Sequence, residues 1–162
     1  KVRIRKYVET NISFFELKRK NSKSRTIKNR IIINEDENID TKRITEFVEN
    51  NSDLKVSDLK ERIYINFQRI TLAHKNLENR CTIDINLEAT WKNKTHKFEN
   101  LVIAELKQES LKNTNDFNLI LKKFKIYQSS FSKYCFSLFN LNTNLKKNNF
   151  NQKNHHLKKI LK

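Results

Sequence analysis

The sequence contains no glycine, no proline and no methionine among its 162 residues. Ordinary protein sequences contain about 7% glycine and about 5% proline, so this absence is a property of the chain and not chance. Without glycine, every backbone position with a positive φ angle must be occupied by a residue that carries a Cβ atom. We therefore expect the turns to rely on Asn, Asp and Ser, which tolerate left-handed geometry less well than glycine does.

The chain also lacks any apolar run near the roughly 18 residues that are needed to span a bilayer. Its first residues carry no secretory signal pattern. The two cysteines, Cys81 and Cys135, show no metal-ligand spacing, and we interpret them as free thiols in a reducing compartment. The sequence thus predicts a cytoplasmic protein, and no membrane association is visible in it.

Acidic residues are scarce relative to basic ones, because 34 Lys and Arg stand against 18 Asp and Glu, a formal net charge of +16. A compact domain with this charge repels itself. A polyanionic partner relieves the repulsion, and nucleic acid, a phosphate polymer and an anionic membrane surface are the classes that fit. The length suits one domain. We expect that domain over residues 1–140, followed by a basic, Lys- and Asn-rich tail over residues 141–162, which contains the solvated pair His155-His156.

Alternation between charged and apolar residues predicts β-strands over much of the chain. The predicted strands cover residues 1–8, 12–20, 25–33, 63–72, 80–90 and 98–108, with turns at 21–24, 73–79 and 93–97. Spacings of three and four residues predict a helix over residues 40–51, and two helical pieces after residue 115 that separate near Ser129 and Ser130. A short turn is expected over residues 53–61. Strands with helices inserted and appended argue for an antiparallel α+β domain.

One face of each predicted strand carries basic residues at alternate positions. In chain order they are Arg3 and Arg5, Lys18 and Lys20, Lys28 and Arg30, Arg69, Arg80, and Lys107. Arg80 is predicted to share its face with Thr82, Asp84, Asn86 and Glu88, and Lys107 is predicted to share its face with Glu105. Such faces, if they converge, suit a phosphate chain, because Arg offers bidentate donors and Lys a point charge. The alternation alone favours an ordinary sheet with one face in water. Solvated faces usually mix both signs, however, and the first and third strands carry no acid on the charged face.

The same segments resemble, in order, the motifs of the VTC-type polyphosphate polymerase domain, a branch of the triphosphate tunnel metalloenzymes within the CYTH-like superfamily. The motifs are KVRIRKY (1–7), FFELKRK (14–20), TIKNR (26–30), YINFQR (64–69) with RCTID (80–84), AELK (104–107) and FSKYC (131–135). They cover about residues 1–135. The family begins with a further strand that carries Glu and Lys, and it precedes the first of these motifs. We therefore expect the domain to be truncated at its N-terminus.

The resemblance implies an antiparallel β-barrel tunnel with flanking helices, which binds ATP or polyphosphate together with Mn²⁺ or Mg²⁺. By motif position, the phosphate-binding residues would be Arg3, Arg5, Lys18, Lys28, Arg30, Arg69, Arg80 and Lys133, with Lys133 and Lys18 also acting as catalytic residues. Glu105 would be the metal ligand, and the alternative for it is a solvent-facing carboxylate paired with Lys107. Glu16 and Asp84 are expected to orient neighbouring Lys and Arg side chains.

The function implied in this way is that of a polyphosphate polymerase-like phosphotransferase. A triphosphatase of the same fold and a non-catalytic polyanion-binding module are the alternatives. We expect no specific nucleic acid partner, because single-strand binders interleave aromatic and basic residues and we predict no aromatic residue on the basic faces of the first and third strands. The sequence gives no indication of the oligomeric state.

Overall fold

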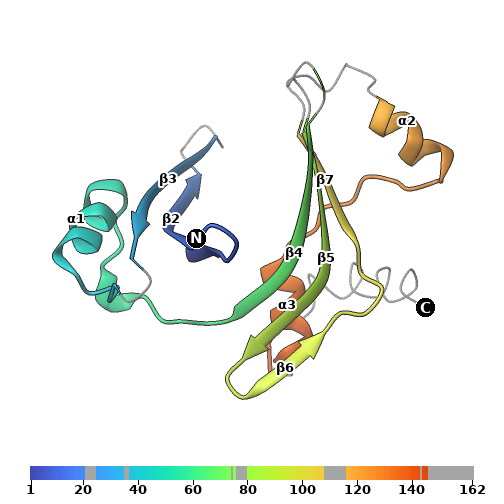
Figure 1. The fold of residues 1–162 in the computed structure, drawn as a ribbon. Helices are drawn as coiled ribbons and strands as arrows, with labels where there is room; N and C mark the ends of the chain where they lie inside the picture. The colour runs from blue at the N-terminus through green and yellow to red at the C-terminus, as the bar shows by residue number, and fades with distance from the viewer. Residues whose placement is uncertain are drawn as a thin grey trace. The chain divides into compact units, whose positions relative to one another are not determined.

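The computed structural model describes residues 1–20, 25–34, 37–73, 75, 80–107, 116–142, 144 and 145. The chain divides into two compact units, Lys1–Glu61 and Arg62–Lys162. Their boundary therefore lies inside the single domain predicted for residues 1–140. The architecture is α+β with antiparallel sheets, as the sequence predicts, and each unit contains one sheet (Figure 1). None of the helices in the described ranges has the length and apolar character that crossing a membrane requires.

The first unit contains a three-stranded antiparallel sheet with the order β1 (Val2–Tyr7), β2 (Ile12–Lys20) and β3 (Thr26–Ile33). All three strands lie within the predicted ranges. The helix α1 (Lys42–Asn51) begins two residues later than predicted, and the 3-10 turn η1 (Val56–Asp58) lies inside the predicted short turn. The turn predicted at residues 21–24 lies outside the described residues.

One face of this sheet forms the core of the first unit. Phe15 of β2 and Ile33 of β3 are buried with Ile44 and Val48 of α1 and with Val56 of η1. The two helix residues are four positions apart, so they lie on the same side of α1. Because successive strand residues point to opposite faces, the even-numbered residues of β2 are directed away from this core. The charged face of β2 is thus the one that the sequence predicts.

The second unit is built around the long strand β5 (Arg80–Trp91). The strand β4 (Tyr64–Ala73) pairs antiparallel with β5 along most of its length, which confirms the predicted hairpin. The strands β6 (Lys94–Lys97) and β7 (Ile103–Lys107) pair with two different parts of β5, residues 88–91 and residues 80–84. Since β4 occupies one edge of β5, both short strands lie along the other edge.

Two helices follow the sheet of the second unit. They are α2 (Asp116–Lys123) and α3 (Lys133–Leu141), and they confirm the two helical pieces predicted after residue 115. Leu141, the last residue of α3, is buried and is the first residue of the predicted tail, so the helix extends into that tail. The remainder of that tail lies largely outside the described residues, including His155-His156.

The prediction of one strand over residues 98–108 is confirmed for residues 103–107, which form β7, and is wrong for residues 98–102. The turn predicted at residues 93–97 is wrong. The latter segment contributes β6, and the chain then leaves the sheet before it returns as β7. Phe98 and Leu101 are both 7% exposed and pack in the core around Leu87. Residues three positions apart on a strand would point to opposite faces. A loop with Asn100 at a φ of 61° brings both side chains into one core, which strand alternation could not reveal.

A β-bulge on β5 changes which of its residues share a face. Arg69 and Ile65 lie on the same face of β4, because they are four residues apart. Their partners on β5, Asp84 and Ala89, are five residues apart, since one extra residue is inserted near Asn86, whose φ is 54°. The predicted common face from Arg80 to Glu88 is therefore wrong. Beyond the bulge the odd-numbered residues of β5 continue the face that carries Asp84.

Residues other than glycine take positive φ at five described positions, which are Asn11, Asn86, Lys92, Asn100 and Lys125. Three of these five are asparagines, which confirms in part that turns rely on Asn. The two lysines lack a short polar side chain that can bond locally. For such residues the left-handed conformation costs about 1–2 kcal/mol. Lys92 lies in the two-residue connection between β5 and β6, where Trp91 pairs with Lys94.

We expect Lys92→Gly to be about 1 kcal/mol more stable than Lys92→Ala, because glycine adopts a φ of 52° without the Cβ clash. Both changes remove the lysine ammonium group, which lies 4.9 Å from the centroid of the Trp91 ring. The comparison therefore isolates the backbone effect. Urea denaturation of both variants measures the difference in the free energy of unfolding. Equal stabilities would show that the left-handed conformation at residue 92 costs no energy for a residue with a Cβ atom.

Candidate functional site

Each sheet carries one buried carboxylate that contacts basic side chains. In the first unit this carboxylate is Glu16, which is 1% exposed although it lies on the face of β2 opposite to the core. In the second unit it is Asp84, which is also 1% exposed and lies before the bulge on β5. Carboxylates are rarely buried to this degree unless they are paired. The two carboxylates therefore locate the candidate sites, one in each unit.

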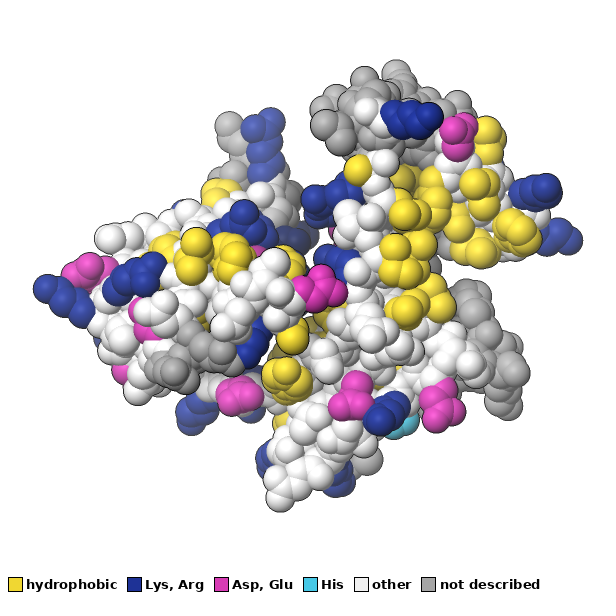
Figure 2. All heavy atoms as spheres, in the orientation of Figure 1, with side chains coloured by type: hydrophobic (Ala, Val, Ile, Leu, Met, Phe, Trp, Pro, Cys, Tyr) yellow, Lys and Arg dark blue, Asp and Glu magenta, His cyan; other side chains and the backbone are white. Residues whose placement is uncertain are grey.

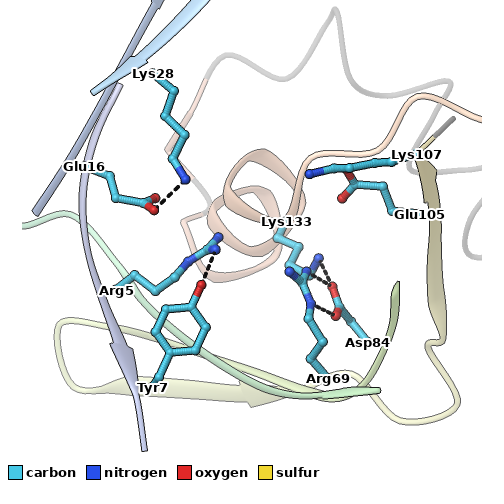
Figure 3. A network of polar contacts seen from close by, with 9 residues as sticks. All are labelled: Arg5, Tyr7, Glu16, Lys28, Arg69, Asp84, Glu105, Lys107 and Lys133. Atoms are coloured by element: carbon cyan, nitrogen blue, oxygen red, sulfur yellow. Dashed lines mark hydrogen bonds and ion pairs between the residues drawn. The ribbon is translucent and has the colours of Figure 1, made fainter. Parts of the chain in front are cut away.

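The Glu16 cluster, defined here as Arg3, Arg5, Glu16, Lys28 and Arg30, spans all three strands of the first sheet. Glu16 lies directly between Arg3 of β1 and Arg30 of β3. Arg3 donates from Nε to Oε2 of Glu16. Nζ of Lys28 lies 2.7 Å from Oε1, and Figure 3 shows this pair. The side chains of Arg3 and Lys28 nevertheless remain 36% and 40% exposed. Glu16 thus holds two cations in place without covering them.

Aromatic rings support the other two cations of the Glu16 cluster. Arg5 donates from Nη1 to the Tyr7 hydroxyl at 3.0 Å, and the Arg30 guanidinium lies 4.7 Å from the centroid of the Phe14 ring. The rings of Tyr7 and Phe14 meet edge to face. The prediction that the first strand has no aromatic residue on its basic face is therefore wrong. Tyr7 is two residues from Arg5 and shares its face, a spacing that was readable in the sequence.

Lys18 extends the basic face of the first sheet by one further position. It lies directly opposite Lys28, in the neighbouring row of the β2–β3 ladder. Like charges at directly opposite positions destabilise a sheet. Lys28 reaches a carboxylate in Glu16, whereas no carboxylate within the described ranges forms an ion pair with the Lys18 ammonium group. The unneutralised charge at Lys18 makes this end of the face suited to an anion.

The Asp84 cluster, defined here as Phe67, Arg69, Asp84 and Lys133, joins three elements of the second unit. Arg69 of β4 donates from Nε to Oδ1 of Asp84 at 2.6 Å and from Nη2 to Oδ2 at 2.8 Å. Lys133 of α3 places Nζ 2.5 Å from Oδ2 (Figure 3). The two cations also lie over the Phe67 ring, at 5.3 and 4.8 Å from its centroid. Bidentate pairing of Arg with carboxylate fixes both the position and the plane of the guanidinium.

The start of α3 determines where Lys133 lies. Ser132 caps the helix, and its side chain accepts a hydrogen bond from the Cys135 backbone N–H. One turn later, Phe136 packs into the core around Leu87 and anchors the helix to the sheet. A cation at a helix N-terminus is unfavourable, because the helix dipole is positive there. The Asp84 carboxylate compensates for this effect by pairing with Lys133.

The remaining predicted residues lie further along the face that carries Asp84. On β7, Glu105 pairs in register with Thr82 and Lys107 pairs in register with Arg80. The Glu105 carboxylate is 3.8 Å from the Lys107 ammonium group, and its side chain is 55% exposed (Figure 3). This is the arrangement that the solvent-facing alternative predicts. Thr82, not proposed as a site residue from the sequence, is buried, and its hydroxyl has no hydrogen-bond partner within the described ranges.

Among the described residues near the Asp84 cluster, Glu105 is the carboxylate best suited to a divalent metal. Within the described ranges, no three His, Cys, Asp and Glu side chains come close enough together to hold an ion. The Asp84 oxygens are already bonded to Arg69 and Lys133. Mg²⁺ is commonly held by one or two carboxylates together with substrate phosphates and water. Glu105 therefore fits a metal that arrives with a phosphate chain, and it does not fit a site made by protein ligands alone.

The basic side chains keep both buried carboxyls ionised. Burial alone would raise the pKa of Glu16, but hydrogen bonds from Lys28 and Arg3 outweigh it and lower the pKa below its ordinary value of 4.5. Burial likewise acts to raise the pKa of Asp84, and the bonds from Arg69 and Lys133 bring it below its ordinary value of 3.8. At neutral pH both carboxylates are therefore charged, and both confirm the expectation that they orient neighbouring cations.

The structure brings the predicted site residues together in two groups. Those of the first unit share one face of its sheet and are Arg3, Arg5, Lys18, Lys28 and Arg30. Those of the second unit lie on or beside one face of its sheet and are Arg69, Arg80, Glu105 and Lys133. Comparison of the chain with models of protein families, with curated proteins and with solved structures finds no match. The functional interpretation therefore depends on the residues and their geometry.

We expect Asp84→Asn to lower the free energy of unfolding by about 2 kcal/mol, because it removes charge-assisted hydrogen bonds and leaves two cations facing each other. Glu88→Gln is the matched control. Its carboxylate is 3.5 Å from Lys97 in a partly exposed pair, which contributes about 0–1 kcal/mol. Urea denaturation at neutral pH measures both. Equal losses for the two variants would show that Asp84 has no special structural role.

The effect of Asp84→Asn is expected to depend on pH. A carboxyl with a lowered pKa in the folded state stabilises the fold fully above its unfolded-state pKa, near the ordinary value of 3.8. That contribution is lost as the pH falls through the folded-state value. The difference in stability between wild type and Asp84→Asn should therefore shrink between neutral pH and about pH 3. A difference that stays constant over this range would contradict the ion pair.

Proposed function

We propose that the chain binds phosphate chains, either inorganic polyphosphate or the triphosphate of ATP, through the Glu16 and Asp84 clusters. The observation that carries this proposal is the same in both units. One buried carboxylate holds two cations in fixed positions, and those cations stay partly exposed. In the Asp84 cluster the side chains of Arg69 and Lys133 are 30% and 20% exposed. Basic groups that are both ordered and accessible are what a polyanion requires.

Ordering the cations in advance favours binding. A free Lys or Arg side chain loses about 1.5–2 kcal/mol of rotamer freedom when it is immobilised. Where a carboxylate or an aromatic ring already holds the side chain, part of this loss occurs on folding and not on binding. The face of the Glu16 cluster carries six cations, counting Lys18 and Lys20, for one carboxylate. Enough positive charge thus remains to attract phosphate after the internal pairs have formed.

The activity we propose is phosphoryl transfer of the polyphosphate polymerase type, within the tunnel architecture that the motif resemblance implies. Such transfer depends mainly on positioning and on neutralising charge. Lys133 and Lys18 are the proposed catalytic cations. Contacts to the phosphate chain are assigned to Arg3, Arg5, Lys28, Arg30, Arg69 and Arg80. The fixed position of Lys133 at the start of α3 supports its role, because a cation that neutralises charge must be held close to the reacting group.

Glu105 is the residue proposed to bind Mn²⁺ or Mg²⁺. The ion would neutralise charge on the phosphate oxygens. Glu105 would then exchange its pairing with Lys107 for the metal, and the Lys107 ammonium group would become available to phosphate. The 3.8 Å separation of this pair and the exposure of both side chains make that exchange inexpensive.

A second candidate function is binding of single-stranded nucleic acid. The observation that favours it is the placement of aromatic rings among the cations, namely Tyr7 and Phe14 in the first unit and Phe67 in the second. Proteins that bind single strands combine basic grooves with rings on which bases stack. These rings are occupied by Arg and Lys in the structure, however, and the Tyr7 hydroxyl accepts a hydrogen bond from Arg5. We therefore favour phosphate chains.

We expect Lys133→Gln to weaken the binding of tripolyphosphate about 10-fold, because a charge-assisted contact is lost. Lys97→Gln removes the same charge at an exposed lysine on β6 and should weaken binding less than about 2-fold. Calorimetric titration at fixed salt measures both affinities. Equal weakening would indicate generic attraction to a basic protein. A parallel titration with single-stranded DNA separates the second candidate, which predicts tighter binding of DNA than of polyphosphate.

Incubation of the chain with ATP and Mn²⁺ or Mg²⁺ tests the reaction. Formation of a phosphate polymer longer than the triphosphate of ATP is the expected result, and Lys133→Gln should reduce its rate by at least about 10-fold, since charge neutralisation in the transition state is lost. Release of orthophosphate without polymer would instead identify a triphosphatase. Binding of polyphosphate with neither product would overturn the catalytic part of the proposal and leave a polyphosphate-binding module.

A further inference from the structure

The segment from Asp116 to Tyr127 exposes more apolar surface than a soluble helix ordinarily does. Five apolar side chains within nine residues are between 52% and 80% exposed, and they are Leu119, Ile120, Phe124, Ile126 and Tyr127. No residue of α2 is buried. Scattered exposed apolar residues are normal, whereas contiguous exposed groups mark interaction sites.

Two of these side chains, Ile120 and Phe124, share one side of the helix with the half-buried Phe117 and Leu121, whereas Leu119 projects from another side. Phe117, Ile120, Leu121 and Phe124 recur at spacings of three and four, which places them along one side of the helix. The helix ends in a Schellman motif, in which the Ile126 N–H donates to the Leu121 carbonyl at 2.9 Å. Lys125 provides the left-handed residue, with a φ of 55°. The motif turns Ile126 back against the last turn, so the apolar surface continues past the end of α2.

Lysines flank the apolar surface. Lys122, Lys123 and Lys125 are all exposed, and Asp116 is the one acidic residue in this segment. Figure 2 shows hydrophobic side chains gathered in the region where Figure 1 draws α2, with basic side chains beside them. The combination of exposed aliphatic and aromatic residues with flanking lysines is typical of helices that lie in a lipid interface.

We propose that residues 116–127 bind an anionic lipid surface. The apolar side chains would enter the boundary between headgroups and acyl chains, and the lysines would contact the phosphates of the headgroups. Phe124 and Tyr127 are suited to this position, since aromatic rings accumulate at membrane interfaces. With 8 residues, α2 is far too short to span a bilayer, so the segment lies on the membrane.

Charge complementarity selects lipid over a second copy of the chain. Two copies would each bring a formal net charge of +16 to the contact, and the three lysines of one segment would face those of the other. Such an interface repels itself. An anionic lipid surface attracts the same lysines. The proposal is independent of phosphate-chain binding, because none of the residues in this segment belongs to the Glu16 or Asp84 cluster.

Sedimentation with vesicles tests the proposal. One set of vesicles contains phosphatidylcholine alone, and the other contains about 30% phosphatidylserine. Because any basic protein is attracted to anionic vesicles, the measurement is repeated at about 0.5 M NaCl, where surface attraction is largely screened. We expect binding to the phosphatidylserine vesicles that persists in part at high salt. Loss of all binding at high salt would overturn the insertion of apolar side chains.

Two double variants separate insertion from charge. Phe124→Ser with Tyr127→Ser keeps every lysine and should lower the salt-resistant binding by at least about 10-fold, because the apolar contacts are lost. Tyr64→Ser with Val102→Ser removes two similarly exposed apolar side chains elsewhere in the second unit and should leave it unchanged. Equal binding by wild type and the first variant would overturn the proposal. The proposal would also be overturned if the wild type formed a dimer in solution and Phe124→Ser with Tyr127→Ser abolished that dimer, since a second copy would then be the partner.

Discussion

The pairing of each buried carboxylate with two cations is the interaction on which both basic faces depend. Glu16 and Asp84 are almost inaccessible to solvent, and removing a charge from water costs several kcal/mol unless partners compensate. Each carboxylate therefore requires its cations, and the cations in turn need the carboxylate to remain close together on one face. A compact unit within a chain of net charge +16 can be maintained in this way. Two of the 18 acidic groups are thus buried among cations, one on each basic face.

The bulge at Asn86 allows one strand to serve two purposes on one face. Leu87 and Ala89, beyond the bulge, pack in the apolar core together with α3. Asp84, before the bulge, lies on the same side and binds Lys133 of that helix. A regular strand would have directed Asp84 and Leu87 to opposite sides of the sheet. The extra residue thus places the polar cluster directly beside the core that supports it, and a single helix covers both.

Sequence patterns predicted the parts of this protein that depend on strand and helix periodicity. The alternation in β2 gave both its limits and its two faces, and the expectation that Glu16 and Asp84 hold neighbouring cations is confirmed. The failures have local causes. The loop at Phe98 buries residues that alternation assigns to opposite faces, and the bulge at Asn86 shifts the register by one residue. Glycine usually marks such loops and bulges. Because this chain has no glycine, neither position could be recognised from the sequence in this way.

Helix α3 carries a basic residue of the candidate site and an anchor of the core within one turn. Lys133 reaches Asp84, while Phe136 is packed among the core residues of the same sheet. A ligand that contacts Lys133 therefore recognises only the folded unit, because unfolding removes α3 from the sheet. Occupancy and folding are then linked equilibria, and the stability gained grows with the logarithm of ligand concentration above the dissociation constant. The melting temperature of the second unit should therefore rise when a ligand binds at Lys133, and a molecule that does not bind there should leave it unchanged.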